Sequence, residues 1–207
     1  MIYGDYDVDG TTSVAMMYSF FKQMYSNLGY YIPDRDQEGY GISYRGIDYA
    51  KENNYSLVIA LDCGIKAVDK IEYAKEHGIK FIVCDHHLPG DQLPDALAVL
   101  NPKRADSSYP YAELSGCGVG FKLLQGYTIK FNLPKAGLMK YLDLVAVSIA
   151  SDIVPITGEN RVLAYYGLQQ LNSKPQKGLE CIIQLSGLQK PHITITDIVF
   201  KIGPRIN

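Results

Sequence analysis

Three apolar segments of this chain each run directly into an aspartate. They are MIYGDYDVDG at 1–10, SLVIALDCG at 56–64 and KFIVCDHH at 80–87. A run of β-forming residues that meets an acid and a turn indicates the end of a buried parallel strand. Ligands of open α/β sheets bind in the crevice outside these strand ends. The pattern therefore predicts an α/β fold in which several carboxylates meet at one edge of the sheet.

Strand and helix patterns alternate over the first half of the chain and become mainly helical after Pro102. Strands are predicted at 1–9, 30–32, 57–61, 80–84 and 96–100, and helices at 13–26, 46–54 and 66–77. Further helices are predicted at 118–131, 136–151, 161–171 and 178–187, followed by a β-rich stretch at 193–202. This order predicts a parallel β-sheet flanked by helices, with a helical second half packed on it.

Composition excludes some functional classes. The net charge of −2 gives no overall basic signature of a nucleic-acid-binding protein, so any positive surface must be local. The longest apolar candidate for a membrane span, 141–154, is interrupted by Asp143 and Asp152 and is shorter than the ~20 residues needed. We therefore expect no membrane association.

The cysteines indicate a reducing environment. There are four, without C-x-x-C spacing: Cys63, Cys84, Cys117 and Cys181. This pattern favours free, mostly buried thiols in a cytoplasmic protein over a disulfide framework. Cys63 and Cys84 adjoin Asp62 and Asp85, so strand alternation should turn the two thiols away from the carboxylates and into the packing.

The acids of the first segment are spaced two apart. In extended backbone such side chains share one face, so we expect Asp5, Asp7 and Asp9 to point the same way. An aspartate-rich turn is the structural alternative. A calcium loop of the D-x-D-x-D-G type is excluded, because its twelfth position is Met16 and not a bidentate glutamate.

Asp62 and the triplet Asp85-His86-His87 each follow a predicted buried strand. A single aspartate in this position is often only a helix N-cap, and for Asp62 alone that alternative stays open. An aspartate followed by two histidines at a strand end is a sharper signal. Carboxylates with an imidazole suit Mn²⁺, or Mg²⁺ with lower affinity, better than a thiolate-rich zinc site. The three strand ends together therefore predict a divalent-metal site.

Two features of the second half are open to more than one interpretation. Asp152 ends the predicted helix 136–151, where the helix dipole disfavours an anion. A metal ion would neutralise this unfavourable charge, which favours a ligand role for Asp152. The alternative is that Asp152 is only a capping or turn residue before Pro155. The GCGVG segment at 116–120 opens another helix and could bind a phosphate there. Close helix packing is the alternative for these glycines.

Four segments, in this order, resemble the motifs of the DHH phosphoesterase superfamily: GDYDVDGTTS, ALDCGI, CDHHLPG and SIASDIVPI. More narrowly, EGYGIS at 38–43, SGCGVGFKLL at 115–124 and IGPRIN at 202–207 resemble its RecJ branch of single-strand-specific exonucleases. The resemblance spans essentially the whole chain.

This resemblance implies a set of site residues. Two ions, Mn²⁺ or Mg²⁺, would be bound by Asp7, Asp9, Asp62, His86 and Asp152, with Asp5 also near them. Asp62 would bridge the ions, His87 would contact the scissile phosphate, and Asp85 would orient the imidazoles. Other branches have a histidine where Tyr3 stands, which makes Asp5 the substitute ligand.

The implied activity is two-metal hydrolysis of single-stranded DNA from its 5′ end, releasing 5′-mononucleotides, in DNA repair and recombination. Arg205 would contact a phosphate, and Tyr40 lies among the tyrosines that could stack on bases. Within the same superfamily, cleavage of short oligoribonucleotides or cyclic dinucleotides is the alternative. A metal-free scaffold that binds DNA or replication partners is the alternative from another class.

The resemblance also implies how the chain is divided. The whole of 1–207 would be a DHH catalytic domain, with a sheet-forming part over about 1–102 and a helical part over about 103–190. From about 191 to 207 we expect the start of a connection to a second domain. Single-strand-binding protein and a helicase are expected partners through regions outside this chain, and we expect a monomer.

Overall fold

Five parallel strands form one sheet in the computed structural model, which describes residues 1–207. They are β1 (Ile2–Gly4), β2 (Tyr30–Tyr31), β3 (Leu57–Leu61), β4 (Lys80–Cys84) and β5 (Ala98–Leu100). Their order across the sheet is β2-β1-β3-β4-β5, and every neighbouring pair is parallel. The chain order reverses between β1 and β3, which is the point where open α/β sheets bind ligands.

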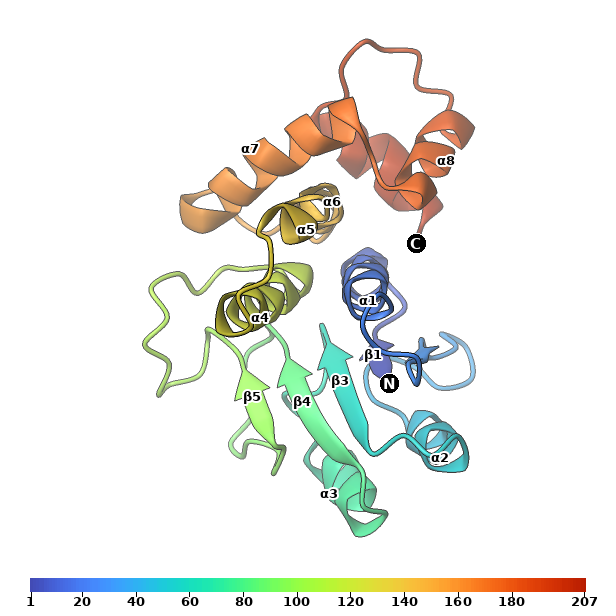
Figure 1. Ribbon diagram of the computed structural model, residues 1–207, viewed down its shortest axis with the longest axis vertical. Helices are drawn as coiled ribbons and strands as arrows, with labels where there is room; N and C mark the ends of the chain where they lie inside the picture. Colours follow the sequence, from blue (N-terminus) through green and yellow to red (C-terminus); the bar gives the residue numbers. More distant parts are fainter.

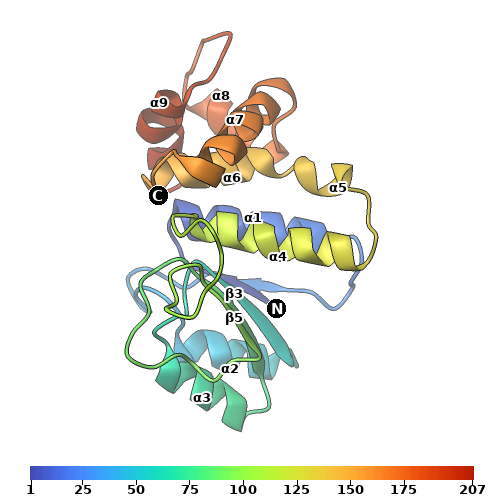
Figure 2. The same ribbon diagram turned by 90° about the vertical axis from the view of Figure 1, so that its left-hand side faces the viewer.

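Helices cover both faces of this sheet (Figure 1). The helices α2 (Tyr44–Glu52) and α3 (Val68–Glu76) lie on one face. On the other face lie α1 (Val8–Phe21) and α4 (Gly116–Lys130), as Figure 2 shows. Alternate residues of β1, β3 and β4 are buried in the two layers, so these apolar runs belong to strands covered on both sides. The predicted α/β sheet flanked by helices is confirmed.

The cysteines lie mostly in these two cores. Cys84 is buried in the layer of α1 and α4, and Cys63 in the layer of α2 and α3. Burial raises the pKa of both thiols, so they are neutral packing groups, as the strand alternation predicts. Cys117 is also buried and Cys181 is exposed, and all four cysteines are free.

The second half of the chain stacks helices on α1 and α4. Its buried centre is α6 (Leu142–Ser151), which lies between α1 and α7 (Gly158–Ser173) in Figure 2. The approach of α6 and α7 requires Gly167, because a Cβ there would lie 2.2 Å from the carbonyl oxygen of Leu142. The separate helix α5 (Ala136–Met139) precedes α6. The single helix predicted over 136–151 is therefore two helices.

The C-terminal segment packs as part of this helical layer. After α8 (Lys177–Leu185), the chain forms α9 (Ile195–Asp197), a π-helical turn at Ile198–Ile202 and a 3₁₀ turn at Gly203–Arg205. The β-rich stretch predicted at 193–202 is therefore wrong. The reason is a capping box: Thr194 and Asp197 satisfy each other's backbone amides and start a helix. None of the helices is both long enough and apolar enough to cross a bilayer.

Candidate metal centre

The first acidic motif is a strand-to-helix turn. β1 ends at Gly4 and α1 begins at Val8, so the chain turns into a helix within three residues. Asp7 is the N-cap of α1, and its Oδ1 accepts a hydrogen bond from the amide of Gly10 at 2.9 Å. The extended conformation predicted for 5–9, and the helix start predicted at 13, are therefore wrong. Asp9 lies in the first helical turn, buried under α4.

Asp9 is bound by the N-terminus of α4 and by α6. Its two carboxylate oxygens accept hydrogen bonds from the amides of Gly116 and Cys117, both at 2.7 Å. The Ser148 hydroxyl of α6 donates a third at 2.8 Å. Burial nevertheless raises the pKa of Asp9. The amides proposed to cradle a phosphate at 116–120 are therefore occupied by a carboxylate, which the positive end of α4 stabilises.

Asp62 follows β3 in a left-handed conformation, with φ of 60°. Its side chain is buried, and neither carboxylate oxygen has a hydrogen-bond partner. Burial, and then the charges of Asp9 and Asp7, raise the pKa of this carboxyl well above its usual range. The start of α4 approaches so closely that a Cβ on Gly116 would lie 2.5 Å from Asp62 Oδ1. The Asp62 carboxylate is thus removed from water without receiving a hydrogen bond from the protein in return.

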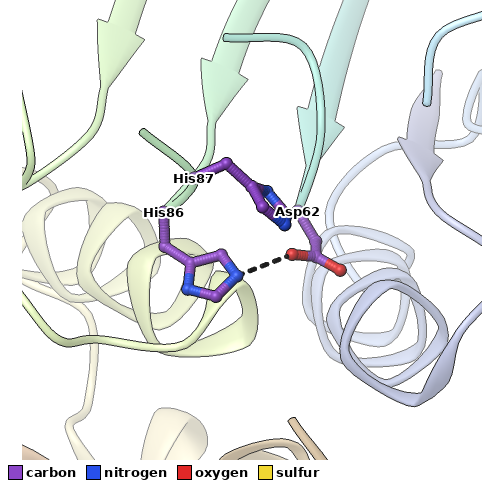
Figure 3. A group of neighbouring side chains, drawn as sticks. All are labelled: Asp62, His86 and His87. Carbon is purple, nitrogen blue, oxygen red and sulfur yellow. Dashed lines mark ion pairs between the residues drawn. The ribbon is translucent and has the colours of Figure 1, made fainter. Parts of the chain in front are cut away.

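His86 lies among several carboxylates, and Figure 3 shows its ring directed toward Asp62. Its Nε2 atom is 3.2 Å from Asp62 Oδ1, 3.6 Å from Asp152 Oδ2 and 3.7 Å from Asp9 Oδ2. Neither ring nitrogen has an aligned hydrogen-bond partner. Burial lowers the pKa of His86, so the ring is held neutral. A neutral imidazole among carboxylates is the form that binds a metal ion.

Asp152 reaches this cluster from the end of α6, where it is the C-cap. Burial, followed by the charges of Asp9 and Asp7, raises its pKa to about 7. The chain then leaves the helix through Ile153, which adopts a left-handed φ of 56°. Asp152 therefore lies at the negative end of a helix dipole, as predicted, and also beside other acids.

Asp85 organises the strand end after β4. Its Oδ1 accepts hydrogen bonds from the amide of His86 at 2.7 Å and from Nδ1 of His87 at 2.8 Å. Its Oδ2 accepts the amide of Ile65 at 2.9 Å. Burial alone would raise the pKa of Asp85, but these bonds lower it, and the bond to Asp85 raises the pKa of His87. The Nε2 atom of His87 is 3.1 Å from the hydroxyl of Tyr40.

Three residues named from the sequence form no hydrogen bond or ion pair with His86 or the carboxylates around it. Both oxygens of Asp5 are bound by backbone amides, at 2.7 Å by Tyr6 and at 3.1 Å by Gly41, and burial raises its pKa to about 6. Tyr3 is buried in the layer of α2 and α3. Arg205 donates hydrogen bonds to the carbonyls of Lys201 and Ser186 and forms none with the acidic cluster. A ligand role for Asp5 and a phosphate contact by Arg205 stay predictions.

The side chains that do converge can form two overlapping ligand sets. One is Asp62, His86 and His87, and the other is Asp9, His86 and Asp152, each with its ligand atoms within 4.8 Å of one another. No lysine or arginine forms an ion pair with these acids. The unpartnered buried oxygens of Asp62 and nitrogens of His86, without an ion pair to lysine or arginine, fit a divalent cation, and this donor set suits Mn²⁺ or Mg²⁺.

Sequence reasoning missed the two serines that support this cluster. Ser115 caps α4, and its hydroxyl lies 2.6 Å from that of Ser148, which binds Asp9. Among the glycines at 116–120, for which close packing was the alternative, Gly116 does pack closely, against Asp62. One signal was present: Ser148 stands four residues before Asp152, on the same face of a helix. Nothing in the sequence pairs either serine with Asp9.

The sequence of this chain is similar to those of known exonucleases along its whole length. The chain is 40% identical over 207 residues to the single-stranded-DNA-specific exonuclease RecJ of Bacillus subtilis (strain 168), covering 100% of this chain and 26% of the relative. It is 34% identical over 218 residues to the RecJ of Escherichia coli (strain K12), covering 100% of this chain and 38% of that relative. The chain thus spans well under half the length of these curated relatives.

Solved structures show the same fold. A crystal structure of exonuclease RecJ bound to manganese superposes with a TM-score of 0.87 and 30% identity, covering 100% of this chain and 51% of that chain. RecJ from Thermus thermophilus in complex with Mn²⁺ gives a TM-score of 0.81 and 27% identity, covering 99% of this chain and 28% of that one. The model of the DHH family, N-terminal domain, matches residues 1–149, and the chain therefore belongs to the DHH family.

Proposed function

We propose that this chain carries the active site of a metal-dependent phosphodiester hydrolase. Its substrate would be single-stranded DNA, degraded from the 5′ end with release of 5′-mononucleotides, in DNA repair and recombination. The names of the RecJ relatives support this substrate over short oligoribonucleotides or cyclic dinucleotides. Because the chain spans only part of those relatives, the activity of the whole protein remains a proposal.

One observation carries the proposal: carboxylates from three segments meet around His86, and the buried ligand atoms of Asp62 and His86 are unpartnered. The residues that would bind two ions are Asp7, Asp9, Asp62, His86 and Asp152. Bound Mn²⁺ or Mg²⁺ would lower the pKa of water and neutralise charge on the phosphate oxygens. The fixed positions of Asp9 and Asp85, each bound by backbone amides, would keep the ligands in place.

His87 is suited to act on the substrate itself. Asp85 holds the proton on Nδ1 and raises the pKa of the ring, which favours the imidazolium form. The Nε2–H of that form would donate a hydrogen bond to a phosphate oxygen and stabilise the charge that develops there. The Tyr40 hydroxyl, 3.1 Å from Nε2, would orient the ring in the free enzyme and contact the substrate when it is bound.

The test is Asp62→Asn, because asparagine keeps the shape of the side chain and tolerates a left-handed backbone. We expect loss of at least 1,000-fold in Mn²⁺-dependent cleavage of a single-stranded oligodeoxynucleotide, with the fold retained by circular dichroism. Calorimetric titration with Mn²⁺ should show at least one binding event fewer than in the parent protein. Ordinary activity in this variant would refute a central role for the cluster.

Substrate choice needs its own comparison. We expect a long single strand with a 5′ end to be degraded faster than a circular single strand, a dinucleotide or a cyclic dinucleotide. Preference for the dinucleotides would favour the alternative activity. A cytoplasmic location, a monomeric state, and partners such as single-strand-binding protein and a helicase remain part of the proposal, as do the boundaries of the domain parts.

A further inference from the structure

Three helices meet at the carboxylate of Asp9 and determine how it is held. Asp9 itself lies on α1, and two backbone amides at the start of α4 point at it. The third helix, α6, contributes the hydroxyl of Ser148. Figure 2 shows α1 and α4 side by side beneath α6. Asp9 is 1% exposed and Ser148 is 0% exposed, so the protein itself decides which lone pairs of this carboxylate are free.

The hydrogen bonds leave Asp9 with one free lone-pair site. An ionised carboxylate has about four such sites, two on each oxygen. Oδ1 accepts the amide of Cys117 at 2.7 Å and the hydroxyl of Ser148 at 2.8 Å, which together fill both of its sites. Oδ2 accepts only the amide of Gly116, at 2.7 Å. The remaining site is on this second oxygen, which lies 3.7 Å from Nε2 of His86. Asp9 can therefore offer one oxygen to a cation.

Ser148 supplies the side-chain part of this restriction. Its hydroxyl is hydrogen-bonded to that of Ser115 at 2.6 Å, and Ser115 is fixed as the N-cap of α4, where it accepts the amide of Gly118 at 3.1 Å. The Ser148 hydroxyl is therefore anchored on both sides. The carboxylate of Asp62 is the contrast, because neither of its oxygens has a partner. Within the acidic cluster, the restriction to one oxygen thus applies to Asp9 and does not apply to Asp62.

Divalent cations differ in how much this restriction costs them. Ca²⁺ takes roughly six to eight oxygen ligands and often binds both oxygens of one carboxylate. Mg²⁺ is smaller and demands a nearly octahedral arrangement of about six ligands. Mn²⁺ also accepts an imidazole beside carboxylates. A carboxylate with one available oxygen therefore deprives Ca²⁺ of a ligand, whereas the smaller ions lose little.

We propose that Ser148 determines which divalent cations this metal centre accepts. By keeping Oδ1 of Asp9 occupied, its hydroxyl disfavours Ca²⁺ relative to Mn²⁺ and Mg²⁺. Without that hydroxyl, Oδ1 would have a free lone pair, and a large cation could bind both oxygens of Asp9. Ser148 is thus a positioning residue, because it contacts a ligand side chain and not the substrate. This inference rests on the proposed function, since it concerns the selectivity of the same site.

The experiment compares Ser148→Ala with the control Ser151→Ala. Ser151 lies on the same helix, and its buried hydroxyl has no hydrogen-bond partner, so alanine removes no bond there. Calorimetric titrations with Mn²⁺ and with Ca²⁺, in the absence of nucleic acid, give the dissociation constant of each ion. We expect the ratio of the Ca²⁺ constant to the Mn²⁺ constant to fall about tenfold in Ser148→Ala, as for one lost hydrogen bond to a charged group. The control should keep the ratio of the parent protein.

Two more variants separate selectivity from a general loss of packing. Ser148→Thr keeps the hydroxyl and should keep the parent ratio, so an equal fall of the ratio in Ser148→Thr and Ser148→Ala would overturn the proposal. If circular dichroism shows that Ser148→Ala does not fold, Ser115→Ala takes its place. That variant leaves the bond to Asp9 but removes its anchor, and it should lower the ratio by a smaller amount. An unchanged ratio in Ser115→Ala would then overturn the proposal.

A competition assay gives a second readout and separates this inference from the proposed function. Ca²⁺ should inhibit Mn²⁺-dependent cleavage of a single-stranded oligodeoxynucleotide at a lower concentration in Ser148→Ala than in the parent protein. A parent protein that binds Mn²⁺ and does not cut DNA would refute the activity, and a fall of the ratio in Ser148→Ala would still support this inference. An unchanged ratio in a folded and active Ser148→Ala would overturn the inference alone. A parent protein without preference for Mn²⁺ over Ca²⁺ would also overturn it.

Discussion

Replacing Asp152 with asparagine should stabilise the metal-free protein and weaken its binding of metal. In the absence of metal, Asp152 is an anion beside Asp9 and at the negative end of α6, and its side chain accepts no hydrogen bond that asparagine would lose. Its oxygen and that of Asp9 are at most 4.8 Å apart. At that distance and an effective dielectric constant of about 20, the repulsion is about 3 kcal/mol.

The pH dependence gives a second route to the same magnitude. The pKa of Asp152 rises from 3.8 to about 7 in the folded protein. Between these two values the folded state keeps a proton that the unfolded state has lost, so stability falls as pH rises. The loss reaches about 4 kcal/mol above pH 7, at 1.36 kcal/mol for each unit. The asparagine variant lacks this titration.

Urea unfolding in the presence of a chelator is the assay. We expect Asp152→Asn to equal the parent protein near pH 4 and to exceed it by about 3 kcal/mol at pH 8, which moves the midpoint by 1 M or more. Saturating Mn²⁺ should stabilise the parent much more than the variant. Asp91→Asn, an exposed position without an ion pair, should change little at any pH. A variant no more stable than the parent at pH 8 would show that the cluster is not electrostatically strained.

Two further substitutions test the supporting residues. Gly116→Ala should weaken Mn²⁺ binding and cleavage at least tenfold, because its Cβ would collide with Asp62. The control Gly126→Ala, on the same helix, meets nothing within 4 Å and should leave activity unchanged while stabilising α4 by up to about 1 kcal/mol. Equal metal affinity in the two variants would contradict the collision. Asp85→Asn should lower the pKa of His87 toward its ordinary value. In the pH profile of kcat, the fall on the alkaline side should therefore begin at lower pH. An unshifted pH profile would mean that His87 does not act as the imidazolium.

Local sequence determined the strands and the strand-end acids. The runs 57–61 and 80–84 became β3 and β4 with those same bounds, because a short, continuous β-branched and apolar run suits a strand buried on both faces. The same runs placed Asp62 and Asp85 at one edge of the sheet, since parallel strands end together. Local pattern failed at 5–9 and 193–202, where side-chain capping by Asp7 and Thr194 started helices and overrode the alternation.

Tertiary structure decided which of these acids are ligands and which are supports. Asp5 and Asp9 look alike in the sequence, yet each is bound by amides of a different distant segment, and only Asp9 approaches His86. The position of His87 is likewise set by tertiary structure, because Asp85 binds both its ring and the amide of Ile65 in a distant turn. Hydrogen-bond partners and burial depend on residues far apart along the chain. A local sequence pattern can therefore identify a candidate carboxylate but cannot show whether it binds metal or supports another residue.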